Sequence, residues 1–417
     1  MGCGQSSSGA APRPVGGAAV AGPQEPKYAG PPVTYNIVNI EVPHEAQTGL
    51  IFSPQTEFKT LTGTVYLPAL TNMYGLGFRM STFNVSPGSM TASGFVSFKV
   101  ESKLKTQGIF HQVPEEERGK WALNMVKTCI PQQVFGTGLL QIGGTVTSQP
   151  IHILQTIEKI SCDGGRLIGI EVTGGSFSGA SAAPVSATMG MGTQPSMMLY
   201  GHSPNTLLCA DIFYEMPTSP SGEKYIYQIV PAKMTAILKT LTGAIGGSWT
   251  VTLDWVNIIG PYLAQGWRLV EIFLDQNNKS FSDNAFMATK ITSEVGAMFI
   301  FEKPASKLND NTPVYEAKMV EYKAPGKMRM AGIGKTTIDV TPNWDSVIAQ
   351  QGQNGWEVVR ILQTPATVFK QSLSMSPEFG WLHYIYFQRK IIQAAPEPEK
   401  SEEPPAPVMP PQEQETA

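Results

Sequence analysis

Residues 265–270 read Gln-Gly-Trp-Arg-Leu-Val, and residues 354–359 read Asn-Gly-Trp-Glu-Val-Val. An amphipathic segment with helical spacing precedes each stretch, and alternating apolar residues follow it. This pattern is typical of a helix that ends at a glycine and passes directly into a strand. Similar strand-like segments flank both stretches, starting at residues 225 and 315 and ending at residues 303 and 390. The sequence therefore predicts copies of one module made of two strands, a helix and two strands.

Two fainter copies precede these, with closing strands expected at residues 95–100 and 208–216. The turn glycines Gly77, Gly165, Gly266 and Gly355 recur at roughly 90 to 100 residues, a domain-sized period. We predict an α+β fold of four tandem ββαββ modules, whose antiparallel sheets each carry one short helix on a face, with disordered N- and C-terminal tails. Because the strands are apolar on both faces, each module should also pack against a neighbour.

Composition and repeat boundaries divide the chain into six expected segments. They are an acylated flexible linker (1–32), module 1 (33–104), module 2 (105–220), module 3 (221–308), module 4 (309–393) and a disordered Pro/Glu-rich tail (394–417). Module 2 holds a Gly/Ser/Met-rich insertion at residues 173–203, with Met189, Met191, Met197 and Met198. This insertion is either a mobile surface loop or a Met-rich contact for a partner or a bilayer.

The third copy shows the local signals most clearly. Asp254 stands where an N-cap is expected, and Gly266 stands where a left-handed residue ends the helix. Trp267 and Trp356 each begin a strand, and we expect them to lie in the core and not to stack on a ligand. The residues that form one helix face are Trp255, Ile258, Ile259, Tyr262 and Leu263.

The 417-residue chain has 41% hydrophobic and 15% charged residues and a formal net charge of −3. This charge gives no reason to expect a nucleic-acid partner. Cys129, Cys162 and Cys209 form no CxxC pair and have no His at zinc spacing, so neither a metal site nor a cofactor is predicted. We expect these three residues to be buried, reduced thiols of a cytosolic protein.

Catalytic motifs are not recognisable in the sequence. Residues 331–337 read Ala-Gly-Ile-Gly-Lys-Thr-Thr and resemble the end of a phosphate-binding loop, but Arg329 occupies the position of its first glycine. No Ser/His/Asp, HExxH or paired-carboxylate pattern can be assembled. The sequence therefore predicts no catalytic residues and a protein that is not an enzyme.

The N-terminus carries the most specific signal for location. After removal of Met1, Gly2 becomes the terminal residue and Ser6 occupies the position that N-myristoylation favours. One acyl chain gives only marginal membrane binding, so a second signal is needed, and Cys3 supplies it as a site of S-palmitoylation. No apolar stretch reaches the roughly 18 to 20 residues of a membrane-spanning helix. Gly2 and Cys3 are therefore the predicted lipidation sites.

A Met-Gly-Cys-Gly terminus followed by several such modules resembles the raftlin family of lipid-raft proteins. Modules 3 and 4 also resemble a small bacterial Gly-Trp-Glu domain of unknown function, through residues 315–320, 355–359 and 386–390. The raftlin resemblance implies an anchor on acylated Gly2 and Cys3 at the plasma membrane. It also implies membrane rafts as the location and a part in signalling or receptor endocytosis. Raftlins have a basic segment after the anchor, whereas this chain has a Gly/Ala/Pro run.

We therefore expect a peripheral membrane scaffold on the cytoplasmic leaflet that binds protein partners the sequence does not identify. Two alternatives stay open. One is an array of modules that binds a small molecule or a lipid headgroup, which a cleft with convergent polar groups would favour. The other is a cryptic enzyme, which requires buried titratable groups clustered in one pocket.

Overall fold

The computed structural model describes residues 28–48, 55–58, 61–93, 99–136, 144–148, 150–178, 206–220, 222–240, 247–283, 290–330, 335–369 and 378–392. Within these ranges the fold is mixed α/β and is dominated by antiparallel strands, as the sequence predicts. The order strand, strand, helix, strand, strand occurs four times along the chain. We call these four successive groups of elements quarters.

The first quarter contains β1 (Tyr35–Thr48), β2 (Gln55–Phe58), α1 (Leu67–Gly75), β3 (Phe78–Ser93) and β4 (Lys99–Gln112). The second contains β5 (Trp121–Gly136), β6 (Gly144–Ser148), α2 (Ile151–Cys162), β7 (Arg166–Ser178) and β8 (Thr206–Pro217). The third contains β9 (Tyr225–Thr240), β10 (Gly247–Thr252), α4 (Trp255–Leu263), β11 (Arg268–Asp283) and β12 (Lys290–Pro304). The fourth contains β13 (Tyr315–Met330), β14 (Lys335–Val340), α5 (Asp345–Gly352), β15 (Glu357–Phe369) and β16 (Glu378–Lys390).

All of these strands belong to one 16-stranded sheet, in the order β10-β9-β12-β11-β6-β5-β8-β7-β2-β1-β4-β3-β14-β13-β16-β15. The quarters are joined because β7 pairs with β2, β11 with β6, and β3 with β14. The strands at the two ends of this order, β10 and β15, also contact each other, so the quarters form a closed ring. The expectation of a separate sheet for each copy is therefore wrong. Pairing between quarters satisfies edge N–H and C=O groups that separate sheets would leave free.

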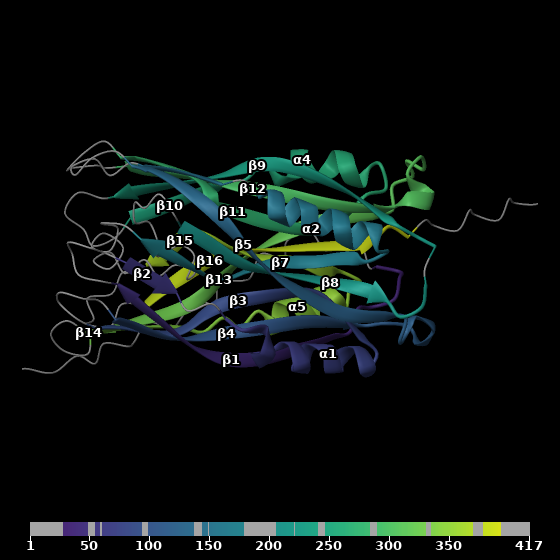
Figure 1. Cartoon of the computed structure of the whole chain (residues 1–417), viewed down its shortest axis with the longest axis horizontal. Helices are drawn as coiled ribbons and strands as arrows, with labels where there is room; N and C mark the ends of the chain where they lie inside the picture. The colour runs from purple at the N-terminus through teal and green to yellow at the C-terminus, as the bar shows by residue number, and fades with distance from the viewer. Residues whose placement is uncertain are drawn as a thin grey trace, which may run out of the picture.

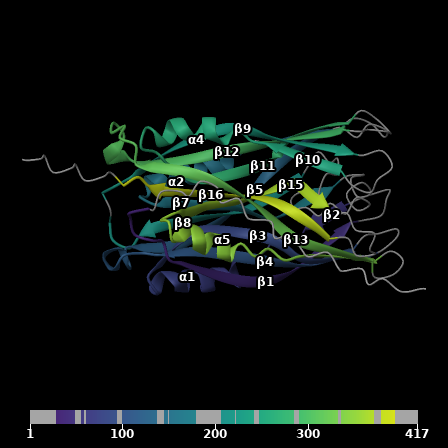
Figure 2. The same ribbon diagram turned by 180° about the vertical axis from the view of Figure 1, so that it is seen from behind.

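The four helices of the described chain lie toward one end of the long axis, on the right in Figure 1 and on the left in Figure 2. Each helix contacts the third strand of its own quarter and the first strand of the next: α1 contacts β5, α2 contacts β9, α4 contacts β13 and α5 contacts β1. Each third strand also contacts the third strands of the two adjacent quarters. The helices therefore cover the joints between quarters, and the third strands surround the axis of the ring.

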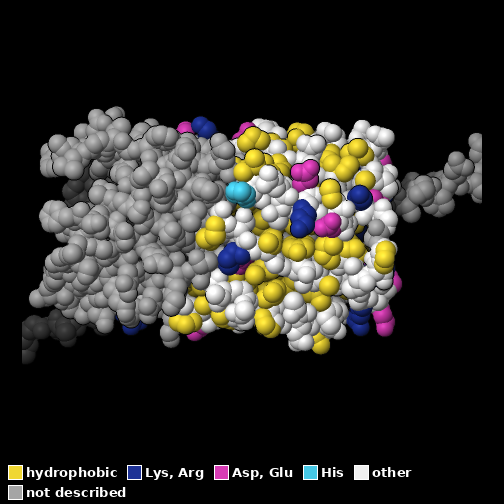
Figure 3. All heavy atoms as spheres, in the orientation of Figure 1, with side chains coloured by type: hydrophobic (Ala, Val, Ile, Leu, Met, Phe, Trp, Pro, Cys, Tyr) yellow, Lys and Arg dark blue, Asp and Glu magenta, His cyan; other side chains and the backbone are white. Residues whose placement is uncertain are grey.

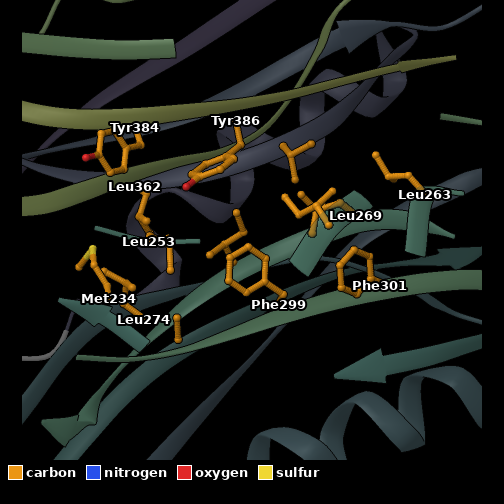
Figure 4. Packing of buried hydrophobic residues seen from close by; sticks show 14 of the residues in the cluster. Met234, Leu253, Leu263, Leu269, Leu274, Phe299, Phe301, Leu362, Tyr384 and Tyr386 are labelled. Atoms are coloured by element: carbon orange, nitrogen blue, oxygen red, sulfur yellow. The ribbon is translucent and has the colours of Figure 1, made fainter. Parts of the chain in front are cut away.

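Hydrophobic packing follows the same cyclic order, because each of the four buried clusters combines residues of two successive quarters. In Figure 4, Tyr384 and Tyr386 of β16 lie on one side of a cluster and Phe299 and Phe301 of β12 lie on the other. The predicted packing of each copy against its neighbours is confirmed. The predicted core positions of Trp267 and Trp356 are confirmed as well, since both side chains are buried.

A glycine with positive φ follows each helix, and the third strand begins one residue after it in the first quarter and two residues after it in the other three. The φ values are 82° at Gly77, 78° at Gly164, 79° at Gly266 and 74° at Gly355. L side chains rarely adopt this backbone region, so glycine is favoured there. The second copy was predicted to turn at Gly165, which is wrong by one residue. The adjacent Gly164 carries the turn, and Gly165 instead donates its backbone N–H to the Ile160 oxygen at 2.8 Å.

Other expected details differ from the structure. The closing strand of the first quarter is Lys99–Gln112, so it continues beyond residue 100 and crosses the expected module boundary at residue 104. Residues 95–98 of the expected strand lie outside the described chain. The expected insertion at residues 173–203 begins inside β7, and residues 179–203 lie outside the described chain. Asp254 is the N-cap of α4, but its side chain accepts a bond from the Asn257 amide at 2.9 Å and not from the helix backbone.

Candidate functional site

One position recurs at the start of every third strand. The residue two places after the turn glycine is Arg79, Arg166, Arg268 or Glu357. In every quarter a register shift of the strand follows, beginning at the next residue. Directly opposite on the fourth strands stand His111, Glu215, Glu302 and Gln388. The four pairs therefore occupy equivalent places around the ring.

These third-strand residues surround a cavity of about 840 Å³ at the end of the ring where the third strands begin. Arg79, Arg166, Arg268 and Glu357 all line it. Tyr28 and Lys390, close to the two ends of the described chain, line it too, and the Tyr28 hydroxyl donates to the Lys390 carbonyl at 3.4 Å. We call this space the axial cavity.

Arg79 and Arg166 bind carboxylates of the next quarter, whereas Arg268 binds a carboxylate of its own quarter. Arg79 binds Glu215 through two nitrogens, with Nε at 2.9 Å from Oε1, and the Tyr74 hydroxyl donates to the same oxygen at 2.6 Å. Arg166 forms an ion pair with Glu302 of the third quarter. Arg268 binds the same Oε1 atom of Glu302 at 2.8 Å, so one carboxylate serves two guanidinium groups.

Exposure separates the two kinds of charge. The side chains of Arg79, Arg166 and Arg268 are 16%, 17% and 24% exposed, whereas those of Glu215 and Glu302 are only 3% and 2% exposed. Burial alone raises the pKa of Glu302, but Arg166 and Arg268 outweigh this effect and hold the pKa at about 2. Glu302 is therefore ionised at neutral pH and lies behind the guanidinium groups that line the cavity.

The fourth quarter reverses the charge of the recurring position. Glu357 is only partly buried and forms no ion pair or side-chain hydrogen bond with the described residues. Burial raises its pKa, but His111, Arg268, Lys390 and Arg79 outweigh burial, and the net pKa lies below the usual value. Conversely, burial lowers the pKa of His111, whose Nδ1 lies 2.8 Å from the Ser81 hydroxyl. At neutral pH the cavity therefore holds an ionised Glu357 beside a neutral imidazole.

Aromatic rings orient two of the guanidinium groups. Arg79 and Arg166 lie 5.0 Å and 5.7 Å from the centre of the Trp121 ring, and Arg166 lies 4.6 Å from that of Tyr225. Such cation–π contacts restrict a guanidinium without consuming its N–H donors. Nε of Arg166 is buried and has no partner in the described chain.

A second polar cluster lies deeper, where the third strands meet. Arg360 of β15 binds Glu171 of β7 at 2.5 Å and lies 3.3 Å from Glu271 of β11, and it donates to the Phe83 carbonyl of β3 at 3.1 Å. The side chain of Arg360 is only 7% exposed. Burial raises the pKa of Glu171 to about 7 in spite of Arg360, and it also raises that of Glu271. One buried cation thus links all four quarters through two carboxylates and one carbonyl.

A third cluster joins β5 and β8. Lys127 binds Asp211 at 2.5 Å, and the buried Tyr66 hydroxyl donates to the same carboxylate. Burial raises the pKa of Asp211 to about 7 and lowers that of Lys127 to about 8. Two residues further along the same strand pair, Cys129 and Cys209 form a disulfide. The expectation of reduced thiols is therefore wrong for this pair. The expectation of burial is correct for Cys209 but wrong for Cys129, which is exposed, and for Cys162, which is a free, exposed cysteine.

None of the residues gathered around the axial cavity was predicted as a site. Gly2, Cys3 and the four methionines of the insertion lie outside the described residues. The signal that could have identified the cavity is the recurrence of a charged residue at the second position after each turn glycine. Placing the second turn at Gly165 shifted Arg166 by one position and concealed its equivalence to Arg79 and Arg268.

Charged side chains are otherwise scattered. On the face seen in Figure 3 they are few and are spread, alone or in small groups, among hydrophobic and uncharged groups. Among the described residues, no group of His, Cys, Asp and Glu could hold a metal ion. No helix within the described ranges is long and apolar enough to span a membrane.

Comparison with family models, curated proteins and solved structures finds no match to this chain.

Proposed function

We propose that the protein is a lipid-anchored scaffold that holds other proteins at the cytoplasmic leaflet of the plasma membrane, in membrane rafts. The observation that carries this proposal is the N-terminal sequence, in which Gly2, Cys3 and Ser6 fit myristoylation followed by palmitoylation. The resemblance to raftlins adds a part in signalling or receptor endocytosis. In this proposal the protein has no catalytic activity of its own, and its partners are proteins recognised by the surface of the ring.

We also propose that the four quarters are copies of one ββαββ module. The repeated element order, the recurring positive-φ glycine and the register shift at the same place in each third strand support this. Because the helices and hydrophobic clusters bridge successive quarters, the ring is expected to behave as one rigid body. Rigidity suits a scaffold, since partners are then held at fixed separations.

The position of Tyr28 supports one orientation of such a body. Tyr28, the first described residue, lies at the axial cavity, and roughly 25 residues separate it from Cys3. If this segment is a flexible Gly-rich linker, its root-mean-square span is about 25–30 Å. The tether would therefore keep the end of the ring that contains the axial cavity close to the membrane.

Metabolic labelling tests the anchor. Full-length wild type, Gly2→Ala and Cys3→Ser would be labelled with alkyne myristate and alkyne palmitate and then separated by membrane flotation. We expect Gly2→Ala to lose both labels and become soluble, and Cys3→Ser to keep myristate but float poorly. Wild type that takes up neither label and stays soluble would overturn the proposal.

The disulfide provides a test of which side of the membrane the protein occupies. Disulfides persist in oxidising compartments and are rare in the cytosol. Thiols in intact cells would be trapped at low pH and labelled with a mass-shifting maleimide. Free Cys129 and Cys209 thiols in cells would support the cytoplasmic leaflet. A pair that stays bonded in cells would overturn the assignment to this leaflet while leaving the lipidation result unaffected.

A further inference from the structure

The axial cavity brings together groups that complement both a negative and a positive charge. Arg166 and Arg268 share one oxygen of a single carboxylate, Glu302, so neither has a partner of its own. Arg79, by contrast, binds both oxygens of its own carboxylate, Glu215, in a two-point contact. Arg166 and Arg268 therefore retain N–H donors for an oxyanion, and both line the cavity.

Glu357 stands at the equivalent position in the fourth quarter and lines the same cavity. Its carboxylate is ionised, is partly exposed and has no partner among the described residues. The neighbouring His111 cannot neutralise it at neutral pH because burial disfavours the imidazolium. The Glu357 carboxylate is therefore able to accept hydrogen bonds from a cationic group in the cavity.

We propose that the axial cavity binds a small zwitterion that carries a phosphate or carboxylate together with an ammonium group. The anionic group lies against Arg166 and Arg268, and the ammonium group lies against Glu357. A volume of about 840 Å³ is within the range of small-molecule sites and leaves room for bridging water. The proposal is independent of lipidation, because every residue that it uses lies within the folded ring.

Two sources present this chemistry, namely a free metabolite and the headgroup of a zwitterionic phospholipid. Tyr28 lines the cavity, and the segment that precedes it connects the ring to the expected membrane anchor. The site is therefore compatible with a headgroup of the adjacent membrane as well as with a free metabolite. We choose O-phosphoethanolamine as the free probe and vesicles of phosphatidylethanolamine and phosphatidylcholine as the lipid probe.

The experiment is isothermal titration of full-length protein with O-phosphoethanolamine and, separately, with inorganic phosphate. The test variants are Arg268→Gln and Glu357→Gln. Arg268 is chosen because Glu302 still forms its ion pair with Arg166 when the Arg268 side chain is replaced. Lys233→Gln is the matched control, since Lys233 forms an exposed pair with Glu294 and does not line the cavity. Circular dichroism and thermal melting establish that each variant is folded.

We expect saturable binding of O-phosphoethanolamine that Arg268→Gln weakens about 10- to 100-fold, because a charge-assisted hydrogen bond to the anion is lost. Glu357→Gln should weaken the binding of O-phosphoethanolamine by a similar factor. The same variant should bind inorganic phosphate as tightly as wild type or more tightly, because a negative charge is removed from the cavity. Lys233→Gln should bind like wild type. The proposal is overturned if O-phosphoethanolamine does not bind, or if either test variant binds it like wild type.

The vesicle arm uses Gly2→Ala protein, so that the anchor does not contribute. Cosedimentation that free O-phosphoethanolamine competes away, and that Arg268→Gln reduces, supports the headgroup as the source. Binding of the free probe without cosedimentation supports a soluble metabolite. Cosedimentation that persists in both Arg268→Gln and Glu357→Gln would refute recognition of a headgroup by this cavity.

Discussion

Replacement of Arg360 by Met is the sharpest test of how the ring is held together. Arg360 is the cation of the buried cluster, and it contacts Glu171, Glu271 and the Phe83 carbonyl. These partners come from the other three quarters. Arg360→Met preserves much of the side-chain volume but leaves two carboxylates, each no more than 3% exposed, without their cation.

The expected cost follows from breaking a buried ion pair by removing one partner, which is about 3–5 kcal/mol. This corresponds to a loss of roughly two to three and a half orders of magnitude in the ratio of folded to unfolded protein. The triple variant Arg360→Met, Glu171→Gln, Glu271→Gln removes the uncompensated charges. It should recover most of that loss, because replacing a whole buried ion cluster is often neutral.

Guanidinium chloride unfolding followed by tryptophan fluorescence would measure these differences, at pH 8 and at pH 5. In wild type the folded-state pKa of Glu171 is raised to about 7 from 4.5. Its contribution to stability is therefore full below pH 4.5 and is lost as the pH rises through 7. Without Arg360 that loss should increase, so Arg360→Met should be less destabilised at pH 5 than at pH 8. A cost below about 1 kcal/mol at pH 8, or an equal cost at both pH values, would refute the reasoning.

Three further outcomes are expected. Burial lowers the folded-state pKa of His383 to about 4 from 6.5, so the fold loses stability as pH falls from 6.5 to 4, and melting of His383→Gln should depend less on pH in that interval. Gly266→Ala should cost about 1 kcal/mol or more, since φ is +79° and the new Cβ would lie 2.7 Å from a backbone oxygen. Gly75→Ala, at the last residue of α1 and with open space around it, should instead stabilise its helix by about 0.5–1 kcal/mol; equal effects in chemical unfolding would contradict this. Reduction of the Cys129–Cys209 disulfide, which spans 80 residues, should cost about 2–4 kcal/mol, and an unchanged melting temperature in dithiothreitol would show that the bond contributes nothing.

The local signals in the sequence were sufficient for much of the fold. The apolar stripe from Trp255 to Leu263 predicted α4 with the observed limits, and the glycines at 77, 266 and 355 predicted three of the four turns. Trp267 and Trp356 were assigned correctly to the core. These features depend on residues within a few positions of each other, so periodicity and backbone preference decide them.

The candidate site could not be derived in this way, because its partners are far apart in the chain. Arg79 meets Glu215 and Arg166 meets Glu302, each across 136 residues, and Arg360 meets Glu171 across 189. The sequence alone determined the type and order of the elements and three of the four turns, and it is the only basis for the predicted lipidation sites Gly2 and Cys3. Only the tertiary structure decided that the quarters close into a ring and that equivalent side chains converge on its axis, because edge pairing and packing between quarters bring together residues that no local pattern connects.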